Sequence, residues 1–322
     1  MKVLQITVHF SPNVGGGETH LDDLVEVLVK QKHEVVVLTY RPLSTKTSWK
    51  IYEKRKGVTI FRIPWVRGFF ERLVRHPALE FLYLLPGLFL FTPLTVLFFR
   101  PNILHGHGLT AGFAAAFWGK IFGIKSVVSM HSIYHFPKRG AYRNFVKFLF
   151  NLSDQILCLS KQSVNEICLL GVPFIRIKKF TYWIDLEKFK KVKDAKKGTG
   201  WDSELTVLFA GRLIPEKGIT QLLESAKKWD KRISLKIAGA GPLEKRIKKT
   251  SRRMDNVEFV GVVSQEKLPA VYSAADLLIL PSTSEEGFGR VIIESLACGT
   301  PVIGSDRGAI PEAMNSSVGQ LI

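Results

Sequence analysis

Two carboxylates, Glu286 and Glu294, flank a Gly-Phe-Gly in the stretch LLILPSTSEEGFGRVIIESLACGTPVIG, where an apolar strand gives way to a helix. A continuous helix between them would separate the two by about 12 Å. That exceeds the roughly 5–9.5 Å between the paired acids of a glycosidase. We therefore expect them to hold opposite ends of one extended ligand, with Glu286 at the helix start and Glu294 two turns further on. Backbone N–H groups between them would hold hydroxyls or an oxyanion. These belong to Gly287, Phe288 and Gly289.

Two cations follow another apolar strand, in VLFAGRLIPEKG (207 to 218). The guanidinium of Arg212 binds two oxygens in a fork, and the ammonium of Lys217 serves as a mobile point charge. Together they would clasp a diphosphate and neutralise it as it leaves, without a metal ion. Alone this signal is weak, because many surface loops contain Arg and Lys.

Three glycines in SPNVGGGETH (11 to 20) lie between the first expected strand and the first long helix. Glycine lets backbone approach a ligand closely, and a helix N-terminus offers N–H groups to a phosphate or an oxyanion. The alternative is a tight turn without a ligand. A nicotinamide fingerprint is disfavoured, because His20 stands where its third glycine would fall and EVVVLTY ends without the ribose-binding acid.

Histidines mark two further expected strand ends, with His105 and His107 in HGHG and His131 in SMHS. They come from different strand ends and lack the i, i+4 pairing and the supporting acids of zinc sites. We expect no metal there and a structural role for His105 and His107.

Charge and cysteine content narrow the class of protein. Lys and Arg number 46 against 28 Asp and Glu, a formal net charge of +18, so the surface attracts phosphates. The basic runs 188–197 and 245–253 carry no aromatic residue beyond Phe189, which disfavours nucleic acid and leaves a solvated face or a membrane-facing patch. The three cysteines form no CxxC pair, which indicates a reducing compartment, and MKVLQITVHF is typical of a strand rather than a secretory signal.

Strand-like and helix-like runs alternate along the chain, which predicts an α/β protein with two doubly wound domains facing a cleft. We expect an N-terminal, acceptor-side domain at 1–183, a linker at 184–203 and a C-terminal domain at 204–322. Ligands of such sheets bind beyond the carboxyl ends of the strands. The expected strands lie near 2–9, 34–39, 58–63, 102–105, 125–130, 155–159, 205–210, 233–238, 257–260, 277–280 and 301–304, with an amphipathic helix at 17–31.

The segment 78–99 has one charge, Glu80, and is long enough to span a bilayer. Pro86, Gly87 and Pro93 are expected to interrupt a continuous helix. Helices in the membrane interface, a buried helix layer and a true span all remain open. Flanking arginines suit anionic headgroups, and they are Arg67, Arg72, Arg75 and Arg100.

Taken together, EGFGRVIIE, GRLIPEKG, AGAGP, VEFVGVVSQEKLPAVYSAADLLILPS and GTPVIGSDRGAIPE resemble glycosyltransferase family 4, the retaining nucleotide-sugar transferases of GT-B fold. GGGETH, HGHG and SMHS agree, so the resemblance covers nearly the whole chain. It departs at YWID, where Tyr182 and Trp183 replace the usual Asn-Gly, so we expect the turn at the hinge to differ from that of the family. Family members also continue past VGQLI through further helices, so we expect a fragment or a short member.

The resemblance implies a role for each matching residue. Arg212 and Lys217 would hold the donor diphosphate, and Glu294 the ribose hydroxyls. Glu286, with the backbone of the following Gly-Phe-Gly, would hold the sugar hydroxyls, and His131 would line the reaction centre. Further donor contacts would come from Gly16, Gly17, Gly241 and Val263. The chain has no Asp-x-Asp motif, which is consistent with the metal-independent chemistry of the family, and no cofactor is expected.

The resemblance also implies a function, the transfer of a sugar from a UDP- or GDP-sugar to an acceptor hydroxyl. The apolar segment and its basic flanks favour a lipid-linked or phospholipid acceptor over a free saccharide, with the protein peripheral on the cytoplasmic face of an anionic membrane. GGGETH and HGHG are similar to the branch that glycosylates phosphatidylinositol. The alternatives are a nucleotide-sugar 2-epimerase and a non-catalytic nucleotide-sugar-binding subunit.

Overall fold

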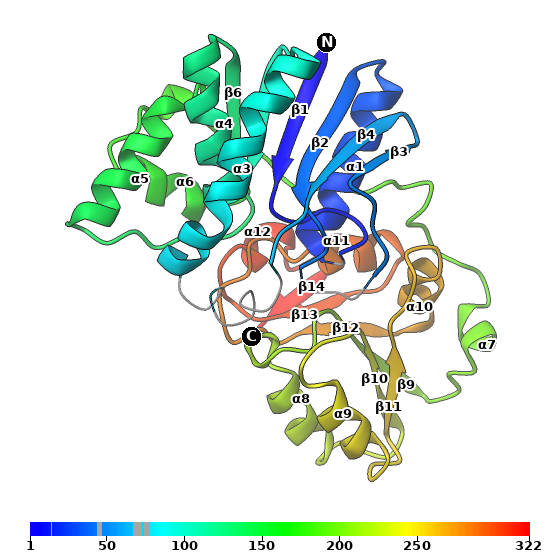
Figure 1. Ribbon diagram of the computed structural model, residues 1–322. Coiled ribbons are helices and arrows are strands. Elements are labelled where there is room, and N and C mark those ends of the chain that lie inside the picture. Colours follow the sequence, from blue (N-terminus) through cyan, green and yellow to red (C-terminus); the bar gives the residue numbers. More distant parts are fainter. Residues whose placement is uncertain (14, 44–46, 67–72, 74–76) are drawn as a thin grey trace. The chain divides into compact units, whose positions relative to one another are not determined.

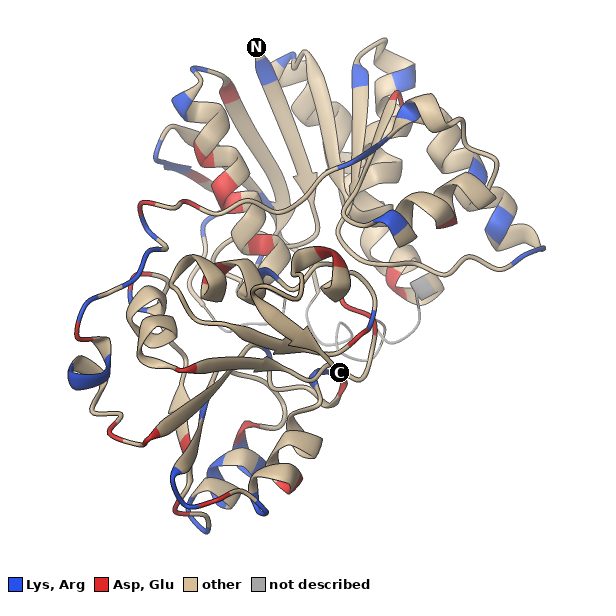
Figure 2. Ribbon diagram, turned by 180° about the vertical axis from the view of Figure 1, so that it is seen from behind, with Lys and Arg blue, Asp and Glu red and all other residues tan. Residues whose placement is uncertain are grey.

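The computed structural model describes residues 1–13, 15–43, 47–66, 73 and 77–322, and the chain forms two compact units, Met1–Thr181 and Tyr182–Ile322. Each unit is an α/β body with its own sheet (Figure 1). The segment 184–203, expected as a linker, contributes Phe189, Ala195 and Trp201 to the core of the second unit. Lys and Arg are spread over the surfaces of both units (Figure 2).

The first unit contains an eight-stranded sheet in the order β3-β4-β2-β1-β5-β6-β7-β8. β3 pairs antiparallel with β4, and the other pairings are parallel. The strands are β1 (Lys2–Thr7), β2 (Glu34–Tyr40), β3 (Tyr52–Arg55), β4 (Val58–Ile63), β5 (Ile103–His107), β6 (Lys125–Met130), β7 (Gln155–Cys158) and β8 (Ile177–Lys179). The helices are α1 (Gly16–Lys30), α3 (Pro77–Phe99), α4 (Gly108–Phe122), α5 (Ala141–Leu152), α6 (Lys161–Leu169) and the 3₁₀ turn η1 (Phe174–Arg176).

Helices cover both faces of this sheet, because buried apolar residues run continuously along its strands. In β2, Val35 and Val37 pack in one cluster with Leu21 of α1. Their neighbours Val36 and Leu38 face the other way and share a second cluster with α3 and α4. The first unit is therefore doubly wound, as the alternating pattern predicted.

The second unit contains a parallel six-stranded sheet in the order β11-β10-β9-β12-β13-β14. Its two faces are also covered, by α8 and α9 on one side and by α10, α11 and α12 on the other. The strands are β9 (Leu205–Ala210), β10 (Ile233–Ala238), β11 (Val257–Gly261), β12 (Leu277–Leu280), β13 (Val302–Gly304) and β14 (Gly319–Leu321). The helices are α7 (Ala195–Thr199), η2 (Pro215–Lys217), α8 (Ile219–Ala226), α9 (Glu244–Ser251), α10 (Leu268–Ala274), α11 (Arg290–Ala297) and α12 (Ile310–Ala313).

One continuous helix, α3, occupies the apolar segment, so the expected interruption by Pro86, Gly87 and Pro93 is wrong. Pro93 has no N–H for the carbonyl of Phe89 one turn earlier, and the indole N–H of Trp118 on α4 donates to that carbonyl at 2.8 Å. Hydrogen bonds from a neighbouring helix thus replace what the proline removes.

The hydroxyl of Tyr40, from β2, enters the α3 ladder near its other proline. It donates to the carbonyl oxygen of Leu84 and accepts from the N–H of Leu88 at 3.1 Å. Gly87 fits here because a Cβ at that position would lie 2.5 Å from the Tyr40 hydroxyl oxygen. The inner face of α3 is therefore fixed to the sheet.

Of the flanking arginines, Arg67, Arg72 and Arg75 lie outside the described residues, and Arg100 is exposed.

A close approach between two loops fixes the carboxyl edge of the second sheet. Gly218, between η2 and α8, has a φ of +70°, and a Cβ there would lie 1.8 Å from the carbonyl oxygen of Pro281 after β12. The N–H of Thr283 also donates to the carbonyl of Glu216 at 2.9 Å. Only glycine tolerates both the positive φ and the lack of space for a Cβ at position 218. This close approach and the hydrogen bond from Thr283 hold the loops after β9 and β12 together.

We predict that Gly218→Ala lowers the free energy of unfolding by about 2 kcal/mol or more, because the methyl group adds overlap to the strain of a positive φ. Gly200→Ala is the control, since Gly200 has a similar φ of +69° with open space around it. That variant should lose only about 1 kcal/mol. Urea denaturation measures both, and equal losses would contradict the close packing at Pro281.

Candidate functional site

A row of polar side chains crosses one face of the first sheet. Parallel pairing sets Gln5 of β1 opposite His105 of β5, and His107 opposite Ser129 of β6. The prediction ended β5 at His105, whereas the strand continues to His107. The two histidines are therefore alternate residues of one strand and lie on the same face, with ring centroids 4.2 Å apart.

His131 directly follows the last residue of β6 and lies within hydrogen-bond distance of this row. Its Nε2 is 2.9 Å from Nδ1 of His107, whose Nε2 is 2.7 Å from the amide oxygen of Gln5. His105 forms a separate contact, from Nε2 to the hydroxyl of Ser129 at 2.7 Å. The ring of His20, on α1, lies 5.7 Å from that of His131. Sequence reasoning missed Gln5 and His20 as site residues, and the only signal for Gln5 was a polar residue in an apolar strand.

Burial keeps His105, His107 and His131 uncharged near neutral pH, because it lowers the pKa of each ring. Desolvation lowers the pKa of His105 to about 3 and that of His131 to about 4, and it holds the pKa of His107 well below its ordinary value. Neutral imidazoles donate through one nitrogen and accept through the other, so the cluster is suited to orienting hydroxyls. Within the described ranges, no group of His, Cys, Asp or Glu is arranged to hold a metal ion.

The glycines of the first loop open α1. Gly16 and Gly17 are its first two residues, one turn before His20. A Cβ at the preceding Gly15 would lie 2.3 Å from a carboxylate oxygen of Glu18, so the Glu18 side chain lies against the backbone at that position. The start of α1 therefore carries both the backbone N–H groups of a helix N-terminus and the imidazole of His20.

In the second unit, Lys217 and Glu286 come together at the loops that Gly218 holds. The ammonium lies 2.5 Å from Oε1 of Glu286, and the hydroxyl of Ser282 donates to the same oxygen at 2.5 Å. Their side chains are 18% and 12% exposed, so a ligand can reach both charges. Arg212 follows β9 and is exposed, and its guanidinium forms no ion pair with any residue that the structure describes.

The remaining donor residues lie along the same edge of the sheet. Gly241 follows β10, and a Cβ there would lie 2.5 Å from the carbonyl oxygen of Leu213, next to Arg212. Val263 follows β11, the next strand outward. Because all these strands are parallel, Val263, Gly241, Lys217 and Glu286 follow four neighbouring strands at one edge, in the order β11-β10-β9-β12. Three spacings between strands extend about 14 Å, which suits an elongated ligand.

Glu294 lies one turn into α11, so the expectation of two helical turns between the carboxylates is wrong. The helix begins at Arg290, after Gly289 in the left-handed region at a φ of 75°, and the residues before it are not helical. Phe288 is buried, and Tyr182 packs edge-on against it at 5.7 Å. Tyr182, which departs from the family pattern, therefore supports the loop that precedes α11.

A buried network holds the carboxylate of Glu294. Arg290 Nε donates to Oε1 at 2.7 Å and the hydroxyl of Tyr272 donates to Oε2 at 2.8 Å, with Glu294 and Arg290 about equally buried. Sequence reasoning missed Tyr272 and Arg290, since only the packing of α10 on α11 brings them to Glu294.

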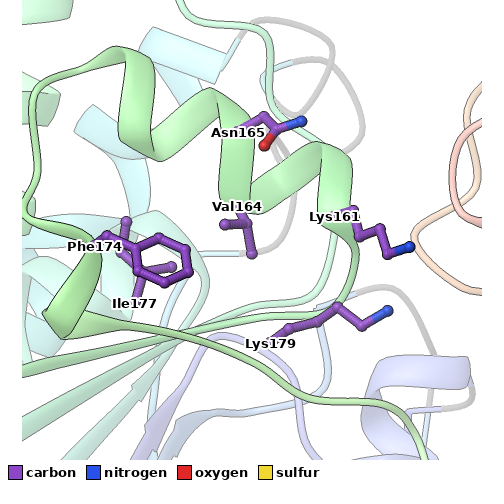
Figure 3. A pocket seen from close by; sticks show the side chains of 6 residues that line it. All are labelled: Lys161, Val164, Asn165, Phe174, Ile177 and Lys179. Atoms are coloured by element: carbon purple, nitrogen blue, oxygen red, sulfur yellow. The ribbon is translucent and has the colours of Figure 1, made fainter.

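A pocket of about 310 Å³ lies elsewhere, between α6 and β8 of the first unit (Figure 3). Lys161 and Lys179 extend in the same direction beside an apolar wall. The wall consists of Val164, Phe174 and Ile177, with Asn165 nearby. The pocket is lined by none of the residues that the sequence predicts for the donor or catalytic site.

We predict that Arg290→Met lowers the free energy of unfolding by about 3–5 kcal/mol, because it leaves the buried Glu294 carboxylate without its cation. Lys248→Met is the matched control, since Lys248 pairs with Glu244 at 2.7 Å on an exposed face of α9. That change should leave urea denaturation unaltered within error. A small effect of Arg290→Met would show that Glu294 is not ionised in the network.

Comparisons with known proteins agree with this architecture. A family model described as Glycosyltransferase Family 4 matches residues 14–188, and one described as Glycosyl transferases group 1 matches residues 191–322. An uncharacterized glycosyltransferase of Methanocaldococcus jannaschii is 27% identical over 99% of this chain and 84% of its own length. A phosphatidylinositol N-acetylglucosaminyltransferase subunit of Arabidopsis thaliana is 24% identical over 98% of this chain and 69% of its own length.

Solved structures show the same fold. Sucrose-phosphate synthase from Thermosynechococcus elongatus has a TM-score of 0.80 at 21% identity, covering 100% of this chain and 85% of that chain. HepE of Anabaena in complex with UDP-glucose has a TM-score of 0.73 at 20% identity, with the same coverage. The predicted α/β fold class of GT-B type is confirmed. The chain therefore belongs to glycosyltransferase family 4 and is a glycosyltransferase.

Proposed function

We propose that this enzyme transfers a sugar from a nucleotide-diphospho-sugar, with retention of configuration, to a hydroxyl of a lipid-linked or phospholipid acceptor at a membrane surface. The observation that carries the donor proposal is the row of residues along the carboxyl edge of the second sheet. Val263 stands at one end, the cations in the middle and Glu286 at the other end. An extended ligand with a base, a diphosphate and a sugar matches that order.

The charges suit the departure of a diphosphate. Arg212 and Lys217 stabilise the leaving group while positive charge grows on the anomeric carbon, and the acceptor hydroxyl enters on the same face of the sugar. The leaving phosphate oxygen takes the hydroxyl proton, so no side chain need act as the base. Glu286 and the backbone N–H groups of Phe288 and Gly289 hold the sugar hydroxyls. The cations supply the charge that a metal ion would otherwise provide.

Relatives support the donor and acceptor classes. A structural neighbour, HepE, was solved with UDP-glucose, and several relatives are named phosphatidylinositol N-acetylglucosaminyltransferase subunits. Lys217 would exchange its Glu286 partner for a phosphate oxygen when the donor binds. The ribose hydroxyls would bind the carboxylate of Glu294, and His131 would contact a substrate hydroxyl.

We predict that Lys217→Ala weakens binding of UDP or GDP by roughly 10- to 100-fold, because a charge-assisted hydrogen bond is lost. Glu286→Ala should abolish transfer while both variants keep the circular dichroism spectrum of the parent. Lys227→Ala is the control, because Lys227 is an exposed lysine directly after α8. Calorimetry measures binding, and no heat with either nucleotide in the folded parent would overturn the donor proposal.

The outer face of α3 supports the membrane proposal. Leucines at positions 79, 82, 90, 94 and 97 recur at helical spacing, and each is 44–66% exposed. We call these five residues the outer stripe. Within the described part of the chain, α3 is the one helix long and apolar enough to cross a membrane, but its inner face packs on the first sheet. We therefore propose that α3 lies along the bilayer interface and does not span it.

Charge and redox state fit the cytoplasmic face of an anionic membrane. Arg100 lies beside the stripe, in a shallow groove with Leu97 and Phe122, where its guanidinium would meet lipid phosphates. The cysteines Cys158, Cys168 and Cys298 are free thiols, as expected in a reducing compartment.

We predict that the protein floats with vesicles containing anionic lipid at low salt, and that Leu90→Gln/Leu94→Gln reduces the floated fraction because apolar area is lost from the stripe. Leu169→Gln/Leu186→Gln is the control, since both leucines are exposed elsewhere. Vesicles without anionic lipid separate the apolar contribution from the charge. A parent protein that stays in the soluble fraction in every case would exclude the membrane proposal.

A further inference from the structure

Three side chains of the first unit form a hydrogen-bonded series, the Gln5–His107–His131 chain. They come from β1, from the end of β5 and from the residue after β6. Gln5 is fully buried and His107 is 7% exposed. The contacts measure 2.7 Å from Gln5 Oε1 to His107 Nε2, and 2.9 Å from His107 Nδ1 to His131 Nε2.

Packing does not require polar groups at these positions. Their neighbours along the strands, Leu4, Ile6 and Leu104, are fully buried hydrocarbon in the middle of a parallel sheet. Burying an amide and imidazoles there carries a desolvation cost that aliphatic side chains would avoid. The amide nitrogen of Gln5 has no hydrogen-bond partner among the described residues, which adds to that cost. The series is better explained by what it does to its outermost member.

The series fixes the position of the proton on each ring. An amide oxygen only accepts, so Nε2 of His107 carries a proton. A neutral imidazole has one N–H, so Nδ1 of His107 accepts from Nε2–H of His131. The acceptor nitrogen of His131 is then Nδ1. Burial lowers the pKa of His131 to about 4 and that of His107 well below its ordinary value, so both rings are neutral at pH 7. Among the described residues, His20 on α1 and His105 on β5 are titratable groups that face the series.

We infer that Gln5 and His107 are positioning residues that hold His131 as the Nε2–H tautomer, so that Nδ1 accepts a hydrogen bond from a substrate hydroxyl. This inference deepens the proposed function and rests on it for the identity of the hydroxyl. An amide suits the task better than a carboxylate, because a carboxylate would favour a charged His107. Positive charge in this cluster would oppose the positive charge that develops on an anomeric carbon.

The tautomer can be observed directly, by NMR of protein labelled with ¹⁵N in its histidine side chains. Protonated and unprotonated ring nitrogens have well-separated shifts, and comparison with His131→Asn assigns the His131 signals. In the parent protein we expect the proton on Nε2 of His131. A proton on Nδ1 would overturn the inference, and it is the result that the opposite orientation of the Gln5 amide would give.

Two variants test the dependence on Gln5. In Gln5→Glu, a carboxylate favours protonation of His107, whose Nδ1–H then donates to His131 and moves the His131 proton to Nδ1. In Gln5→Leu the acceptor is absent, and His131 should show both tautomers. Ser129→Ala is the matched control, because it removes the partner of His105 from the same sheet face and should leave the His131 signals unchanged. An unchanged His131 spectrum in both Gln5 variants would overturn the inference.

Transfer kinetics provide a second readout. Gln5→Glu should lower kcat about 10-fold or more, because the proton moved to Nδ1 of His131 removes the acceptor for the substrate hydroxyl. KM should change little, and Ser129→Ala should change neither constant. The NMR result needs no substrate, so a protein with the expected tautomer but no transfer would refute the proposed function and leave the inference on the tautomer standing.

Discussion

The organisation of this glycosyltransferase depends on one constraint, that neighbouring parallel strands end at the same edge of a sheet. In the second unit this brings Lys217 and Glu286 into contact although 69 positions separate them. In the first unit it brings Gln5 to His107 across 102 positions. Hairpins would not do this, because antiparallel neighbours end at opposite edges. Residues with complementary chemistry can thus be placed on separate strands and still meet.

The two carboxylates of the EGFGRVIIE stretch are held in different ways. Arg290 and Glu294 are 5% and 6% exposed, and the hydroxyl of Tyr272 donates to Glu294, so this network is part of the core. Lys217 and Glu286 are only partly buried, at a place where the loops end. A deep pair costs much to break, whereas a shallow pair can exchange partners with an incoming anion at little cost. One short sequence therefore supplies Glu294, which is held firmly in the core, and Glu286, which can exchange its partner.

Much of the fold was predictable, because long runs of Val, Ile and Leu mark the central strands of both sheets. The short edge strands β3 and β8 were missed, since YEKR and IKK carry no apolar pattern. β5 was ended too early because a buried histidine resembles the end of a strand. α11 was started too early because Gly289 adopts a left-handed conformation that a helical rise does not foresee. At the sites, residue type and motif were enough to single out Lys217, Glu286 and His131, but not their partners, which depend on register and packing.

The prolines of α3 have a consequence for how the protein is made. A segment this apolar would be a candidate for lateral release into lipid during synthesis. Once the domain has folded, detaching α3 would deprive the Phe89 carbonyl of the Trp118 indole. Pro93 has no N–H to take its place and hydrocarbon offers no donor, so that carbonyl would be left bare. The helix is thus apolar enough to enter a bilayer, yet this carbonyl keeps its hydrogen bond only while α3 remains docked on its own domain.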